Sequence, residues 1–94
     1  MSDEEKKLRE QLEKEAEEWV QKEFARRFQA ARETMEKQGK ESEHHLHMMG
    51  VNDTSRIASE TQMSISYAKS ELMMDVKFEA DQWVEEELKK RLKK

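Results

Sequence analysis

The scarcity of turn-forming residues is the strongest constraint on this chain, which has no proline and only two glycines in 94 residues. Strands joined by tight turns need such residues at each reversal, so the sequence excludes an all-β fold. Helix-forming residues instead run from residue 3 to residue 49, interrupted only at Gly39. We therefore expect an all-α protein built from long helices.

One short stretch, GVND at residues 50–53, has the composition of a turn between two helices. Gly50 suits the left-handed position that follows a helix, and the polar residues at 52–54 can cap the helix that comes next. The sequence thus predicts a long antiparallel helical hairpin with helices over about 3–49 and 54–92.

The first helix begins with a capping signal and contains one weak point. Ser2 can cap its start, and Glu5 occupies the position that completes a capping box. Gly39 costs only about 1 kcal/mol inside a helix, so a continuous helix can contain it. The alternative is a three-helix bundle in which the first helix breaks at Gly39.

Two separate apolar rows run along the second helix when its residues are spaced at 100°. The first row is expected to pack against the first helix and consists of Ile57, Thr61, Ile65, Ala68, Leu72, Val76, Ala80 and Trp83. The second row lies roughly 120° or more away around the same helix and consists of Met63, Tyr67, Met74 and Phe78. A lone hairpin can bury only one row, and soluble monomers rarely expose a contiguous apolar strip.

The apolar face of the first helix drifts around its axis. One side carries Leu8, Leu12, Ala16 and Trp19, and a side rotated by about 100–150° carries Phe24, Phe28, Ala31 and Met35. We expect the two halves of this helix to contact different neighbours. The hairpin is therefore predicted to dimerise into a four-helix bundle. The expected interface residues are Met63, Tyr67, Met74, Phe78, Phe24, Phe28 and Met35.

A weak internal repeat agrees with a hairpin. The segment EAEEWVQKEFARRF at 15–28 resembles EADQWVEEELKKRL at 79–92, and both contain a Trp-Val pair. Trp19 and Trp83 lie at equal distances from Val51 along the chain. Folding at Val51 is expected to bring both tryptophans to one level, far from the turn.

The overall composition and charge indicate which kinds of binding partner and which cellular location to expect. Acidic residues number 22 and basic residues 18, which leaves a net charge of −4 and gives no general attraction for nucleic acid. The N-terminal MSDEEKKLRE lacks an apolar signal core, and no long apolar run is present. We expect one helical domain over 1–94, cytoplasmic and soluble, that does not contact membranes. No nucleophile motif or phosphate-binding loop is recognised, so no enzymatic activity is expected.

All three histidines fall at 44, 45 and 47, close to the turn. Glu41 and His44 form a Glu-x-x-His pair, which resembles the ligand motif of di-metal carboxylate bundles. Glu43 and His47 stand four residues apart on one helix face, and the hairpin is expected to place Glu60 across from residues 41–44. Imidazole and carboxylate ligands suit zinc or iron, so the candidate metal site consists of His44, His47, Glu41, Glu43 and Glu60, although the second helix has no histidine. No other cofactor is expected.

The two ends of the chain follow the rules of idealised helices. Residues 1–18 and 83–94 combine caps, charges that suit the helix dipole and Glu–Lys pairs, so the chain resembles engineered or de novo designed α-helical bundles. The leading hypothesis for function is a coiled-coil-like structural module whose partner is a second copy of itself. Two alternatives are a metal-binding helical bundle and a subunit of a hetero-oligomer whose exposed row binds a heterologous helix.

Overall fold

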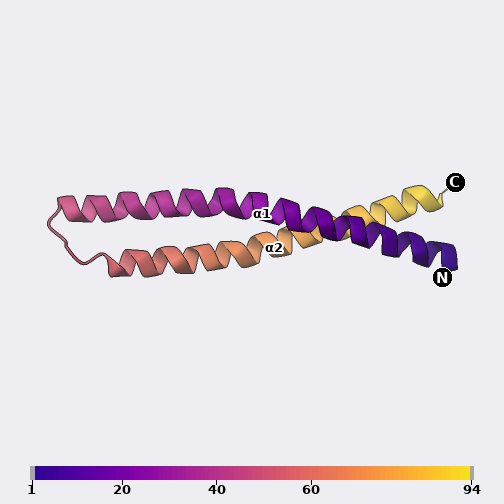
Figure 1. The fold of residues 1–94 in the computed structure, drawn as a ribbon, viewed down its shortest axis with the longest axis horizontal. Helices are drawn as coiled ribbons and strands as arrows, with labels where there is room; N and C mark the ends of the chain where they lie inside the picture. The colour runs from indigo at the N-terminus through magenta and orange to yellow at the C-terminus, as the bar shows by residue number, and fades with distance from the viewer. Residues whose placement is uncertain (1, 94) are drawn as a thin grey trace. The chain divides into compact units, whose positions relative to one another are not determined.

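The computed structural model of this chain describes residues 2–93. Two helices, α1 (Asp3–Met48) and α2 (Ser55–Leu92), form a hairpin, and the described residues contain no strand (Figure 1). The predicted hairpin is therefore confirmed, with helix boundaries within one residue of those expected. The three-helix alternative is wrong, because α1 continues through Gly39 without a break.

The absence of a side chain at Gly39 has a packing reason. A Cβ atom at this position would lie 2.7 Å from Thr61 Oγ1 and 3.3 Å from Thr61 Cγ2. Glycine therefore lets Thr61 of α2 approach the backbone of α1 closely. Helix α1 includes Gly39 although glycine costs about 1 kcal/mol relative to alanine inside a helix.

The turn that ends α1 is a Schellman motif. Gly50 has a φ of 86°, in the left-handed region that favours glycine. Val51 N donates to Leu46 O at 2.9 Å, and Gly50 N donates to His47 O at 3.1 Å. These two bonds satisfy carbonyl groups that the end of a helix leaves unpaired. The predicted role of Gly50 is confirmed.

The helix starts are capped by side chains. Ser2 Oγ accepts a hydrogen bond from Glu5 N at 3.2 Å at the start of α1. Before α2, Asp53 Oδ1 accepts bonds from Ser55 N at 3.1 Å and from Ser55 Oγ at 2.7 Å. The side-chain and then the backbone bond from Ser55 lower the pKa of Asp53 below its ordinary value. Both starts thus use the residues that the sequence suggested.

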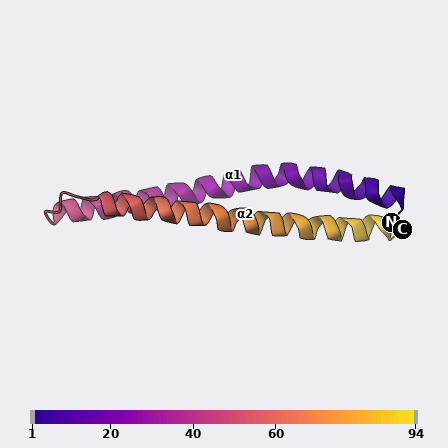
Figure 2. The ribbon, with the colours of Figure 1, turned by 90° about the horizontal axis from the view of Figure 1, so that it is seen from below.

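The contacts of the hairpin divide into two compact units. The terminal unit contains the described residues of Met1–Ala25 and Met73–Lys94, and the turn unit contains Arg26–Leu72. Within each unit, α1 and α2 lie side by side and run in opposite directions (Figures 1 and 2). A single domain over 1–94 stays a prediction.

The terminal unit contains a continuous core. A cluster of buried side chains forms its centre, and partly buried residues of α1 pack against this cluster. The buried members are Leu12, Ala16, Ala80, Val84 and Leu88, and the partly buried ones are Leu8 and Val20. On each helix these residues recur every four positions. Arg9 Nη1 also donates to Glu85 Oε1 at 2.8 Å, which joins α1 to α2 across the surface of this unit.

Four-residue steps explain why the tryptophans lie outside this core. A face spaced at 3.6 residues predicts that Trp19 lies with Leu12 and Ala16, and that Trp83 lies with Ala80. Each step of four residues turns the contact face by about 40°, because 3.6 residues complete one turn. The residue that follows each tryptophan therefore faces inward instead. Val20 is half-buried and Val84 is buried, whereas Trp19 and Trp83 are exposed.

The turn unit has much less burial. Ile65 is its only buried residue, and this segment is described throughout. Its other inward-facing positions are half-buried and include a threonine and a glycine. They are Phe28, Ala31, Met35, Gly39, Leu46, Ile57, Thr61, Ala68 and Leu72.

Candidate functional site

Helix α2 exposes four large apolar side chains. Met63 and Tyr67 belong to the turn unit, and Met74 and Phe78 belong to the terminal unit. Their exposed fractions lie between 61% and 72%, although buried residues such as Ile65 and Val76 occupy the same helix. Each pair is spaced by four residues, so its two members lie on one side of the helix. In the turn unit, buried Ile65 lies two positions from both Met63 and Tyr67, and in the terminal unit, buried Val76 lies two positions from both Met74 and Phe78. Two positions turn a helix by about 200°, so each pair lies opposite the buried residue of its own unit. We call Met63, Tyr67, Met74 and Phe78 the α2 row.

The three interface residues expected on α1 lie differently. Phe24, Phe28 and Met35 are half-buried within the single chain. Part of their apolar surface is therefore covered before any second molecule binds. The α2 row is the more available part of the predicted interface.

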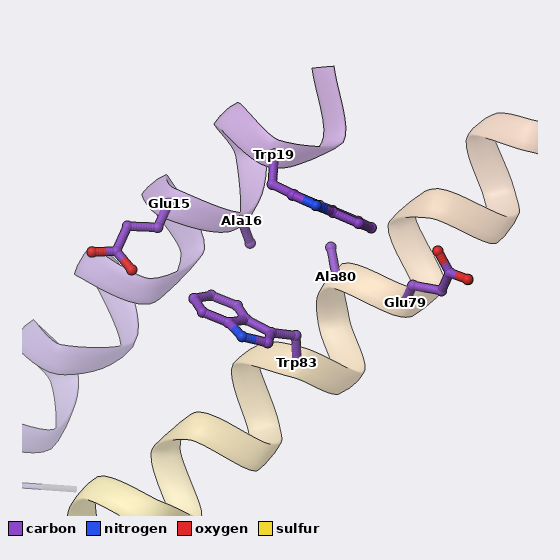
Figure 3. Close-up of a pocket in the computed structure, with 6 residues that line it drawn as sticks. All are labelled: Glu15, Ala16, Trp19, Glu79, Ala80 and Trp83. Carbon is purple, nitrogen blue, oxygen red and sulfur yellow. The ribbon is translucent and has the colours of Figure 1, made fainter. Parts of the chain in front are cut away.

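An apolar groove lies on one side of the terminal unit. Its six lining residues are Glu15, Ala16, Trp19, Glu79, Ala80 and Trp83, and its volume is about 470 Å³. Figure 3 shows the two indole rings reaching from opposite helices, on either side of the alanine pair. The exposed fractions of Trp19 and Trp83 are 41% and 36%. We call this feature the Trp groove.

The Trp groove has an internal two-fold pattern. Glu15, Ala16 and Trp19 on α1 have the same order and spacing as Glu79, Ala80 and Trp83 on α2. Two antiparallel helices that present the same three residues to one groove are related by an approximate two-fold rotation. The prediction that both tryptophans reach one level is confirmed. The groove itself was missed, and the shared Glu-Ala-x-x-Trp spacing was the signal for it.

A second groove in the terminal unit has a different lining. It shares Ala16 and Ala80 with the Trp groove but has charged walls, where Lys77 stands among acidic residues. Its full lining is Glu13, Ala16, Glu17, Val20, Lys77, Ala80, Asp81 and Val84. One groove beside this alanine pair is therefore aromatic, and the other is ionic.

The predicted metal ligands lie around the end of α1 and the start of α2. Glu41 and His44 line one shallow surface depression, and Glu41 lines another together with His45. Glu60 Oε1 accepts a hydrogen bond from Arg56 Nε at 3.1 Å, within α2. Among the described residues, no three histidine, aspartate or glutamate side chains come together as a ligand set. The zinc or iron site through His44, His47, Glu41, Glu43 and Glu60 stays a prediction.

The electrostatics of the terminal unit centre on Arg9. The hydrogen bond to Glu85, with smaller contributions from the charges of Glu85, Glu13 and Glu5, raises the pKa of Arg9. Arg9 thus remains a fixed cation that links the two helices. It does not line either groove of this unit.

No protein-family model matches this chain, and comparisons with curated proteins and with solved structures find no similar protein. Neither helix, over the residues that the structure describes, contains a stretch long and apolar enough to cross a membrane.

Proposed function

We propose that this chain is a self-association module whose hairpins pair through α2 into a homodimeric four-helix bundle. The observation that supports the proposal is the α2 row, in which four large apolar side chains remain mostly exposed in the single chain. Pairing would remove this apolar surface from water, at roughly 25 cal/mol for each Å² buried. Helix pairs with unburied faces reach a stable core by forming bundles.

The spacing of the α2 row suits an antiparallel contact between two copies. The four residues are separated by four, seven and four positions, so the row has the same spacing in both directions. In a two-fold dimer, each residue meets the residue that mirrors it along the row. Met63 would then lie against Phe78 of the second copy, and Tyr67 would lie against Met74 of the second copy.

This antiparallel arrangement also pairs sulfur with aromatic rings. Both contacts join a methionine to a phenylalanine or tyrosine, and such contacts stabilise by about 0.3–1.5 kcal/mol each. A parallel arrangement would instead place each residue against its own copy. The antiparallel arrangement is therefore the favoured orientation of the dimer.

Cysteine cross-linking tests this orientation, because the chain has no cysteine of its own. Ser70 lies between Tyr67 and Met74, close to the expected two-fold axis. Ser70→Cys should form a disulfide-linked dimer rapidly under mild oxidation, and Met63→Cys should not. Efficient cross-linking of Met63→Cys to itself would contradict the antiparallel arrangement and indicate a parallel one.

A charged substitution tests whether the α2 row forms the contact between the two copies. Met74→Lys would place an unpaired cation in the contact, so the dimer dissociation constant should rise by about tenfold or more. Met49→Lys is the matched control, because Met49 is similarly exposed, at 68%, but lies outside the α2 row. Equal weakening by both variants would contradict the role of the row.

A further inference from the structure

The two tryptophans of the Trp groove are not among the buried residues that form the core of the terminal unit. Val84 and Leu88 are buried in that core, while Trp19 and Trp83 stay at its edge. Each tryptophan residue therefore keeps more than a third of its surface exposed. The two rings bound a groove whose floor is made by the two smallest apolar side chains, Ala16 and Ala80 (Figure 3).

The charge of the lining selects the kind of molecule that fits. Among the described residues that line the Trp groove, the charged ones are Glu15 and Glu79, and none is cationic. The side chain of Glu15 makes no hydrogen bond or ion pair within the described part of the chain. An anion would meet a carboxylate and the negative faces of two indoles, so the groove disfavours it.

Aromatic faces together with carboxylates attract cations that carry apolar groups. A methylated ammonium ion has a diffuse charge that interacts with the face of tryptophan, and its methyl groups pack against apolar surface. A bare ammonium or metal ion holds its water more strongly and gains less from such a groove. The neighbouring ionic groove contains Lys77 and no aromatic residue, so it lacks these features.

We infer that the Trp groove binds a methylated ammonium group between Trp19 and Trp83, with Glu15 as the counter-charge. The occupant that we infer is a free quaternary ammonium compound; a methylated lysine side chain shares this chemistry and is the alternative that the test distinguishes. The inference does not depend on dimerisation, because none of the lining residues belongs to the α2 row.

The two tryptophans provide the test, because the chain has no others. Titration with choline, at constant ionic strength kept by sodium chloride, should change the intrinsic fluorescence with saturation. The neutral carbon isostere 3,3-dimethylbutan-1-ol should bind about tenfold more weakly, since it lacks the charge. Equal binding of the two compounds would overturn the inference and leave only an apolar groove.

A matched pair of glutamate variants tests the counter-charge. Glu15→Gln should weaken choline binding several-fold, whereas Glu13→Gln in the ionic groove should leave it unchanged. Both side chains are exposed, so both variants should keep the wild-type circular dichroism. Equal weakening by both would show a general charge effect and overturn the assigned site.

The rings are tested one at a time. Trp19→Leu and Trp83→Leu should each weaken binding by several-fold, and the remaining tryptophan reports the titration. The affinity of a trimethyllysine peptide is then compared with that of its unmethylated form and with that of choline. A trimethyllysine peptide that binds more tightly than both would show that the ligand is a methylated lysine side chain and would overturn the assignment to a free compound. Binding that survives both leucine variants would overturn the inference.

Discussion

The two units of the hairpin are stabilised in different ways. Of the seven buried apolar residues in the described part of the chain, the terminal unit contains six, among them the fully buried Leu12 and Val76. An ion pair also joins the two helices of this unit. The turn unit has only Ile65 buried, yet it contains the Schellman turn and the Asp53 cap. Side-chain packing therefore stabilises the terminal unit, whereas local hydrogen bonds stabilise the turn unit.

Two leucines provide the largest expected contrast between the units. Leu12 is fully buried in the terminal unit, and Leu46 is half-buried in the turn unit. Leu12→Ala should lower the free energy of unfolding by about 2–5 kcal/mol, and Leu46→Ala should cost about half as much or less. Urea unfolding of both variants at one protein concentration measures the difference. Equal losses would show that the two units pack equally well.

The contact between Gly39 and Thr61 predicts a strongly coupled pair in the turn unit. Gly39→Ala should destabilise the chain by about 1 kcal/mol, because its Cβ would clash with the threonine hydroxyl. In a Thr61→Ala background the same change should stabilise by up to about 1 kcal/mol, because alanine favours helix more than glycine does. A double-mutant cycle measured by urea unfolding tests this reversal of sign. Additive effects would contradict the close contact.

The left-handed turn predicts a graded response at Gly50. Gly50→Ala should cost about 1 kcal/mol, because its φ of 86° is unfavourable for a residue with a Cβ atom. Gly50→Asn should cost less, since asparagine tolerates this region better than alanine. Thermal unfolding monitored by circular dichroism compares the two variants. A Gly50→Ala variant as stable as wild type would exclude the Schellman turn.

The smallest effect is expected at Asp53 and depends on pH. Its pKa is lowered in the folded chain from an ordinary value of 3.8, so the charged form stabilises the turn unit above that value. The stabilisation should be lost as the pH falls through the lowered pKa. The advantage of wild type over Asp53→Asn in melting temperature should therefore be complete at neutral pH and shrink in acid. An advantage that grows in acid would contradict the cap.

The local features of this fold were predictable from sequence, and the position of the core was less so. Gly50 and Asp53 act through backbone groups a few residues away, so their identities alone indicate the turn. Trp19 and Trp83 were assigned to the core because a face spaced at 3.6 residues was assumed. The buried residues Val76, Ala80, Val84 and Leu88 instead advance by four. Both helices carry apolar residues at this four-residue spacing, but only their packing against each other shows which apolar positions are buried.

The candidate sites also differ in how far the sequence alone predicts them, because some lie on one helix and others need two. The α2 row belongs to one helix, so its spacing was readable before the structure was known. The Trp groove needs two helices placed side by side, and only the repeat at 15–28 and 79–92 indicated it. The metal hypothesis combined residues of the first helix, such as His44 and His47, with Glu60 of the second helix, and it stays a prediction, because no three such side chains come together among the described residues.

Sedimentation equilibrium of the unmodified chain, at micromolar concentration and in EDTA, tests self-association most directly. The proposal predicts a molar mass of twice the 11.3 kDa of one chain, with no metal required. A folded species with the mass of a single chain would contradict it. The α2 row would then be a surface for a different protein's helix.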